Sequence, residues 1–308
     1  MPSKRTCSSL VKALLIPFGI VASAIIVIPN VDAQLAQPHQ LEQKFDADVV
    51  VYGDASGGVT ATVQAARMGK SVILVAPFGH LGGLSSSGLG YTDIGNPAIL
   101  GGISREFFHR AYLHYQKDDS WTHTKRADFK NSGQGTPAFN AQTELASVFE
   151  PKVAEAIFDA LIKESNVKVI KGRLDLKNPL VKEGKRIAQI HLEGGAKLSG
   201  RMFIDASYEG DLLAGAGVSY TIGREANKQY DEAHNGIVGM QKNNQLPLNI
   251  DPYKVKGDSS SGLLEGVNAD QGGEKGDADH RLQAFCYRMV LTNVETNRVP
   301  IIKPKDYD

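Results

Sequence analysis

Two short apolar strands, joined by a glycine-bearing turn and a helix, constrain the fold of this chain most. Residues 47–52 and 71–75 are runs rich in valine, and such short β-branched runs are typical of strands buried in a sheet. Between them, residues 57–70 carry small and apolar residues at helical spacing and include Gly69 near their end, a residue type that commonly ends helices. The segment therefore predicts a βαβ unit of about 30 residues, the arrangement that carries dinucleotide sites.

The turn after the first strand reads Gly53-Asp54-Ala55-Ser56-Gly57-Gly58. It matches the dinucleotide fingerprint G-x-G-x-x-G at its first and last glycines, with Ala55 in place of the middle one. Gly53 permits the tight turn, Ala55 is small enough for a backbone near a pyrophosphate, and Gly58 lets the helix and the strand pack closely. N–H groups at the start of the helix, at Ser56 and Gly57, would face the phosphates. We expect a nucleotide site here, and the alternative is a turn with a purely structural role.

Two positions depart from the fingerprint. Asp54 brings a carboxylate beside the expected pyrophosphate, and the two negative charges repel each other unless the side chain points away. Ala76 stands at the end of the second strand, where an acid usually receives the ribose hydroxyls. Residues 76–80 contain no Arg or Lys, which argues against NADP and its additional phosphate.

The patterns that follow predict how the sheet continues. A helix is expected near residues 103–116 and another from Pro151, and then a third buried strand at 167–171. Three alternating segments between residues 174 and 204 predict an antiparallel meander that returns to a core strand. The predicted fold class is α/β: a Rossmann-like, three-layer domain with a parallel sheet and the meander as an excursion. The expected domain boundaries are 47–222 for this domain, with 77–143 as an insertion, and 223–308 for a loop-rich, incomplete substrate or cap region.

Five further stretches make the chain resemble a known family: His80-Leu81-Gly82-Gly83 with the Ser/Gly-rich segment through residue 93, then residues 101–106, 203–211 and 217–225, and the closing Asn297-Arg298-Val299-Pro300. Together with the βαβ unit, they resemble the bacterial FAD-dependent oxidoreductases of the glutathione-reductase-like fold, in particular those often labelled xanthan lyase-like. The resemblance runs from about residue 47 to residue 308.

The resemblance implies FAD as the cofactor and assigns roles by motif position. The glycine turn would hold the FAD pyrophosphate, Gly82 and Gly83 would approach the flavin, and Asp205 would accept hydrogen bonds from the ribityl or pyrophosphate region. Asp205 also ends a buried strand, where α/β sheets bind ligands; its alternative role is to cap a helix expected at 208–215. His80 is a candidate for a cofactor hydrogen bond or a covalent link, and its alternative is an ordinary loop histidine. Related proteins run well beyond this length, so we expect the chain to be C-terminally truncated or its flavin pocket to be incomplete.

The N-terminal segment predicts export. Basic residues precede an apolar run at 13–29, and Val31-Asp32-Ala33 supplies small residues at the spacing of a cleavage site, which is the layout of a secretory signal peptide over residues 1–33. Residues 34–46 are expected to be a linker. The mature protein would be periplasmic or extracellular and would keep no stable membrane span, with a retained N-terminal anchor as the alternative.

Composition narrows the function further. Lys plus Arg (34) equals Asp plus Glu (34), which removes the electrostatic case for a nucleic-acid partner. The histidines show no metal-ligand spacing, so no metal site is expected. The sequence favours an exported FAD-dependent oxidoreductase that takes a hydride from a small organic or carbohydrate substrate. The alternatives are a non-catalytic remnant of a flavoprotein fold and an NAD-dependent dehydrogenase. Catalytic residues and the oligomeric state are left open.

Overall fold

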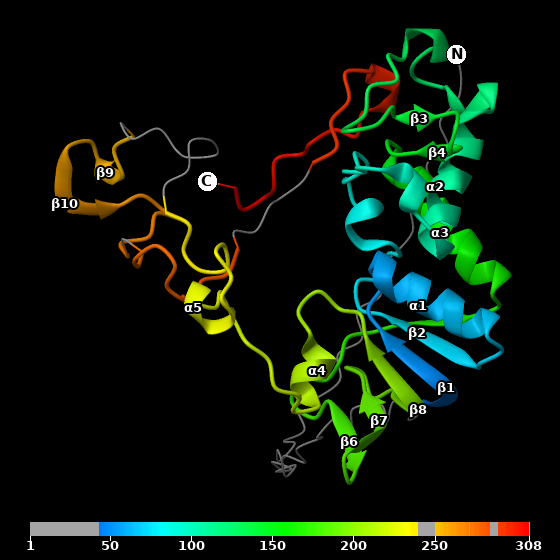
Figure 1. The fold of residues 1–308 in the computed structure, drawn as a ribbon, viewed down its shortest axis with the longest axis horizontal. Coiled ribbons are helices and arrows are strands. Elements are labelled where there is room, and N and C mark those ends of the chain that lie inside the picture. The colour runs from blue at the N-terminus through cyan, green and yellow to red at the C-terminus, as the bar shows by residue number, and fades with distance from the viewer. Residues whose placement is uncertain (1–42, 240–249, 271, 284–288, 308) are drawn as a thin grey trace, which may run out of the picture. The chain divides into compact units, whose positions relative to one another are not determined.

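The computed structural model describes residues 43–239, 250–270, 272–283 and 289–307 (Figure 1). The expected signal peptide at 1–33 lies outside these residues, so export stays a prediction. In the part of the chain that is described, no helix is both long and apolar enough to cross a membrane.

A six-stranded sheet in the order β5-β2-β1-β8-β7-β6 forms the centre of the fold (Figure 1). Its parallel strands are β1 (Lys44–Tyr52), β2 (Val72–Ala76), β5 (Lys168–Lys171) and β8 (Lys197–Asp205). The strands β6 (Leu180–Glu183) and β7 (Arg186–His191) pair antiparallel and extend the sheet beyond β8. The parallel sheet and the meander are both confirmed.

Two apolar cores lie on opposite faces of the sheet, as expected for a three-layer domain. On one face, Val49, Val51 and Leu74 pack against the helices α1 (Ser56–Arg67), α2 (Gly102–Tyr115) and α3 (Pro151–Glu164). On the other face, Val50 and Val75 pack against residues of the meander and against Leu212 of the short helix α4 (Asp211–Gly215). Alternate residues of β1 therefore belong to different cores, which explains why its sequence is apolar throughout.

The first strand begins earlier than expected. The sequence predicts a linker through residue 46, but β1 starts at Lys44, and Lys44–Ala47 pair with Lys197–Gly200 of β8. Phe45 packs against the core on the meander face. The sequence did not indicate a strand at residues 44–46 because the residues on either side of Phe45 are polar.

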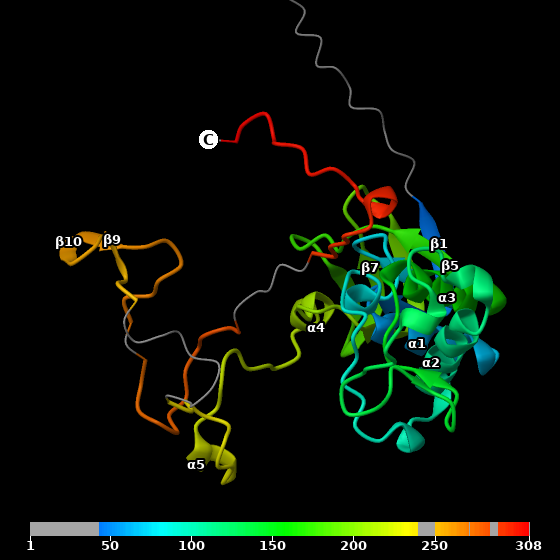
Figure 2. The same ribbon diagram turned by 90° about the horizontal axis from the view of Figure 1, so that it is seen from above.

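The insertion after β2 contains more structure than its composition suggests. Besides α2, it holds single turns of 3₁₀ helix and the strand β3 (Phe139–Asn140). This strand pairs antiparallel with β4 (Leu145–Ala146), which lies just past the expected end of the insertion at residue 143. After residue 222 the described elements are the short helix α5 (Asn227–Tyr230), a hairpin of β9 (Tyr253–Val255) and β10 (Asp258–Leu263), and one 3₁₀ turn at Glu295–Asn297 (Figure 2). The expected domain boundary at residue 222 stays a prediction.

A chain of ion pairs joins the three helices that cover the sheet. Both carboxylate oxygens of Glu106 in α2 accept from Arg67 of α1, at 2.6 and 3.0 Å. Arg110 of α2 also donates to Glu106, at 2.7 Å, and to both carboxylate oxygens of Glu164 in α3. The hydrogen bonds from Arg67, assisted by those from Arg110, lower the pKa of Glu106 from its ordinary 4.5 to about 2.

This network makes a pH-dependent contribution to stability. Because the pKa of Glu106 is lower in the folded state, its contribution is complete above about pH 4.5 and is lost as the pH falls toward 2. We expect Glu106→Gln to reduce the free energy of unfolding at pH 7 by about 1 kcal/mol, a modest value because the network is largely solvated. Urea unfolding followed by circular dichroism from pH 7 to pH 2 tests this. The difference from wild type should shrink across that window, whereas the exposed control Glu193→Gln should show no such difference.

Candidate functional site

Three loops meet at the carboxyl ends of β1, β2 and β8. They are the glycine turn at 53–58, the loop at 77–86 and the loop at 206–210, and backbone contacts join each to a neighbour: Gly82 N donates to Asp54 O at 2.8 Å, and Ala206 N donates to Tyr52 O at 2.7 Å. The carboxyl edge of a parallel sheet is where α/β proteins bind ligands. The segments singled out from the sequence are therefore brought together at one site.

Gly53 and Gly58 are required by the space around them. Gly53 has φ +125°, and a Cβ atom there would lie 2.3 Å from the carbonyl carbon and oxygen of Ala206. A Cβ on Gly58 would lie 1.9 Å from the carbonyl oxygen of Gly53. These contacts give the two glycines the roles predicted for them: the tight turn, and the close packing of α1 on the strand that precedes it.

Asp54 points away from the expected phosphate position. The side chain is only 3% exposed, and one carboxylate oxygen accepts hydrogen bonds from the N–H groups of Phe78 and Gly79, both at 2.9 Å. The predicted repulsion of a pyrophosphate is thereby reduced, because the carboxylate is turned into the protein and is satisfied by the next loop. A substitution that removes this acceptor would leave two backbone donors unpaired, so the carboxylate has a structural role that sequence reasoning missed.

The N-terminus of α1 is open to a ligand. Its capping residue is Ala55, which offers no side-chain hydrogen bond, and the first turn contains no acidic residue. Ser56 and Gly57 are exposed, and a Cβ built on Gly57 meets nothing within 4 Å. The partial positive charge of the helix end and its backbone N–H groups therefore face free space beside the glycine turn.

Gly82 and Gly83 lie next to the glycine turn, each against an aromatic ring. Gly82 bridges to Ala55, and a Cβ on Gly82 would lie 2.3 Å from the ring of Phe158 in α3. A Cβ on Gly83 would lie 2.2 Å from the hydroxyl oxygen of Tyr208. This hydroxyl accepts a hydrogen bond from Leu84 N at 2.9 Å. Tyr208 thus joins two of the three loops, a role the sequence gave no signal for beyond its place in a family-like motif.

His80 lies at the edge of the site, with both ring nitrogens facing protein acceptors. Nδ1 lies 2.7 Å from a carboxylate oxygen of Glu155 in α3, and Nε2 lies 3.2 Å from the carbonyl oxygen of Ser86. This geometry makes His80 a tether between its loop and α3. It does not favour the proposed cofactor hydrogen bond or covalent link, because either would require a ring nitrogen to leave its present partner.

Asp205 ends β8, and its carboxylate is held by the segment that follows it. One oxygen accepts from the backbone N–H and the hydroxyl of Ser207, at 2.9 and 2.7 Å, and the other accepts from Leu213 N at 2.7 Å. The helix starts at Asp211 and not at residue 208, and its N-cap residue is Gly210. Asp205 therefore contributes to this helix end only through the hydrogen bond from Leu213 N in the first turn. Carboxylate oxygens have further lone pairs, so the half-buried group can still accept from a ligand.

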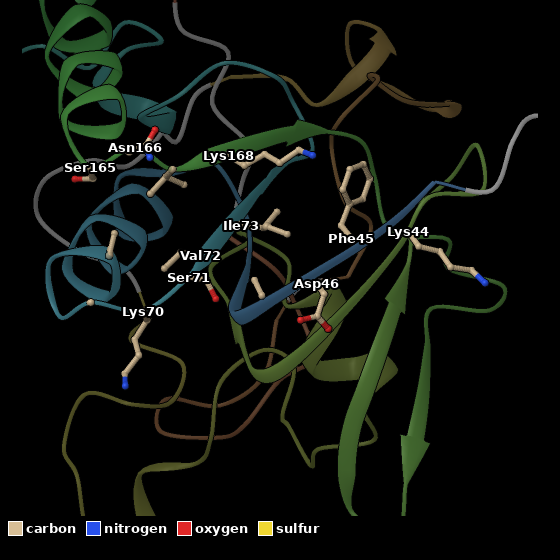
Figure 3. Close-up of a pocket in the computed structure, with 14 residues that line it drawn as sticks. Lys44, Phe45, Asp46, Lys70, Ser71, Val72, Ile73, Ser165, Asn166 and Lys168 are labelled. Carbon is tan, nitrogen blue, oxygen red and sulfur yellow. The ribbon is translucent and has the colours of Figure 1, made fainter.

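Hollows are also found away from this site. One of about 700 Å³ opens at the opposite, amino-terminal ends of β1, β2 and β5, where Lys168 lies over the ring of Phe45, 4.1 Å from its centroid (Figure 3). This is the wrong edge of a parallel sheet for a dinucleotide. No group of His, Cys, Asp and Glu side chains among the described residues could hold a metal ion.

A family model described as "FAD dependent oxidoreductase" matches residues 48–308. The chain belongs to this family. The match agrees with the resemblance on which the sequence prediction rested, although it does not reach the narrower xanthan lyase-like label. Among curated proteins, no sequence match was found.

Several solved structures match parts of this chain at low sequence identity. An FAD dependent oxidoreductase from Pseudomonas aeruginosa is 15% identical over 60% of this chain and 54% of its own, with a TM-score of 0.37. L-proline dehydrogenase from P. horikoshii is 14% identical over 60% and 59%, with a TM-score of 0.37. L-amino acid deaminase from Proteus vulgaris is 16% identical over 59% and 52%, with a TM-score of 0.36. The matched region therefore spans little more than half the length of these proteins.

The residues at this site fit the pyrophosphate of FAD, the cofactor that the family name specifies. The site offers an uncapped helix end, open space at Gly57, and backbone approaches that a Cβ atom at Gly53, Gly58 or Gly83 would block. It lacks the acid that usually accepts hydrogen bonds from the ribose, because the residue at that position, at the end of β2, is the buried Ala76. The residues thus fit the pyrophosphate of FAD, but the position that would contact the adenosine ribose lacks its usual acid.

Gly57 and Gly58 form a matched pair for testing this packing. We expect Gly58→Ala to lower the free energy of unfolding by at least about 2 kcal/mol, since the new methyl group meets the Gly53 carbonyl oxygen. Gly57→Ala fills open space in the first turn of a helix, where it should be neutral or stabilising by up to about 1 kcal/mol. Chemical denaturation of both variants measures the difference, and equal stabilities would contradict the close packing of α1 on the turn.

Proposed function

We propose that the chain binds FAD across the three loops and uses it to oxidise a small organic or carbohydrate substrate outside the cytoplasm. The observation that carries the proposal is the convergence of the turn at 53–58, the glycine pair at 82–83 and the strand end at 205 on one sheet edge. Bound flavin would supply the hydride acceptor, and the chain's own residues would bind and orient it.

Each loop has a distinct part in this proposal. The N-terminus of α1 and the backbone near Ala55 hold the negative pyrophosphate, because the helix end supplies N–H donors and partial positive charge. Asp205 accepts from the hydroxyl groups of the ribityl chain with the lone pairs that Ser207 and Leu213 leave available. Tyr208, through its bond with Leu84, fixes the distance between the Gly82-Gly83 element and the end of β8.

Of the polar residues in family-like segments, Arg224 is committed to a bidentate ion pair with Asp279, with contacts of 3.2 and 2.6 Å. It is therefore a structural residue in this arrangement. The competing reading, a remnant that keeps the fold without binding flavin, is supported by Ala76 in place of the ribose acid, and flavin binding decides between the two.

Ser56→Asp separates cofactor binding from folding. An acid at the first position of α1 should stabilise the helix by about 0.3–1 kcal/mol through its dipole. The same charge would lie where the pyrophosphate binds, so FAD affinity should fall by about tenfold or more. The measurement is a titration of FAD by flavin fluorescence, with the isosteric neutral variant Ser56→Asn as the control. If Ser56→Asp bound FAD as well as wild type, the pyrophosphate would not lie at this helix end. If the wild type were folded and bound no FAD, the chain would be a remnant of a flavoprotein fold.

Export is proposed from the basic, apolar and small-residue segments of positions 1–33. We expect the mature protein recovered from outside the cytoplasm to begin near Gln34. N-terminal sequencing of that protein is the direct measurement. A chain that retains Met1 and stays in the membrane fraction would instead support the N-terminal anchor.

A further inference from the structure

Two basic side chains flank the loop that follows β2. Lys171, at the end of β5, is the register partner of Ala76 in β2, so their side chains share one face of the sheet. The Cδ and Nζ atoms of Lys171 lie 3.2 and 3.7 Å from the position that a Cβ atom would take on Gly79. Lys171 therefore runs along this loop, beside the strand end where the ribose acid is missing.

Arg173 contacts the same loop at Phe78 and Pro77. Its guanidinium carbon lies 5.6 Å from the centroid of the Phe78 ring, and its Nε donates to the carbonyl oxygen of Pro77 at 3.5 Å. Both basic residues are exposed. Neither of them forms an ion pair with a carboxylate of the described residues.

The charge balance at this end of the site is the reverse of that in a usual dinucleotide fold. An acid at the end of the second strand accepts from the ribose hydroxyls and repels a phosphate on that ribose, whereas basic residues accommodate the phosphate. Here the acid is replaced by the small, buried Ala76. Lys171 of the neighbouring strand is paired with it in register, and Arg173, just after that strand, contacts the loop that follows Ala76. Asp54, beneath the loop, is already satisfied by Phe78 and Gly79.

We propose that Lys171 and Arg173 form the adenosine-ribose end of the dinucleotide site and favour an adenosine whose ribose carries a 2′-phosphate. The inference rests on the proposed function, because it places the adenosine of a dinucleotide over β2. Lys171 and Arg173 supply donors only, so they bind the hydroxyl oxygens of an unmodified ribose weakly and a phosphate strongly. The ligand class thus extends from FAD to adenosine nucleotides with a phosphorylated ribose.

Two small probes isolate this part of the site. The full-length wild-type protein is titrated calorimetrically with adenosine 2′,5′-bisphosphate and with adenosine 5′-monophosphate, and each probe is then competed against FAD. We expect the bisphosphate to bind about tenfold more tightly than the monophosphate, since one charge-assisted hydrogen bond supplies that difference. The preference should weaken at high salt because the cations are exposed.

Variants connect the preference to the two side chains. The double variant Lys171→Gln, Arg173→Gln should bind both probes equally, and Ala76→Glu should favour the monophosphate. Lys185→Gln, in the turn between β6 and β7, is the control and should keep the wild-type preference. Thermal unfolding of each variant checks that the fold is retained.

The outcomes distinguish this inference from the proposed function. Wild type that binds FAD but shows no preference for the bisphosphate overturns the inference and leaves the flavin site standing. A preference that survives in the double variant also overturns it, because the phosphate must then be recognised elsewhere. Wild type that is folded and binds neither FAD nor either probe overturns both proposals.

Discussion

The contact between Gly58 and the carbonyl oxygen of Gly53 is the constraint on which the site depends. It lets α1 approach β1 so closely that not even a methyl group fits between them. The helix end is thereby fixed at the carboxyl edge of the sheet. Gly53 in turn touches Ala206, so the same few atoms join β1, α1 and β8. The positive helix end and the end of β8 are consequently held together by packing, before any ligand contributes.

A negative charge inside this turn would work against an anionic ligand if it were free. The chain resolves the conflict by turning Asp54 away from the expected phosphate and using its carboxylate to order Phe78 and Gly79. The ordered loop then provides the surface along which Lys171 and Arg173 lie. Asp54, which departs from the dinucleotide fingerprint, thus supports the loop after β2. This loop follows Ala76, where the chain lacks the usual ribose-binding acid.

The sequence predicted the sheet well because its information is local. Buried strands, helical periodicity and turn glycines can each be recognised within a few residues, and the parallel connection follows from their order. The contacts that were missed join distant segments: Asp54 with Phe78, His80 with Glu155, and Tyr208 with Leu84. The basic residues beside the loop that follows β2 were missed for the same reason. A search of residues 76–80 for Arg or Lys could not find side chains that come from β5 and from the segment just after it.

Gly82 and Gly83 are held in a defined position although they lie in the long insertion after β2. Its loop leaves the sheet at Ala76, and the chain forms α2, a separate small sheet and α3 before it rejoins the central sheet at β5. Helix α3 nevertheless holds the loop in place at two points, through Phe158 against Gly82 and through Glu155 against His80. Since α3 is itself packed on the core and joined to α2 by the Arg110–Glu164 pair, the loop inherits the rigidity of the helical layer. The insertion can therefore vary in length without moving Gly82 and Gly83, provided that α3 keeps these two contacts.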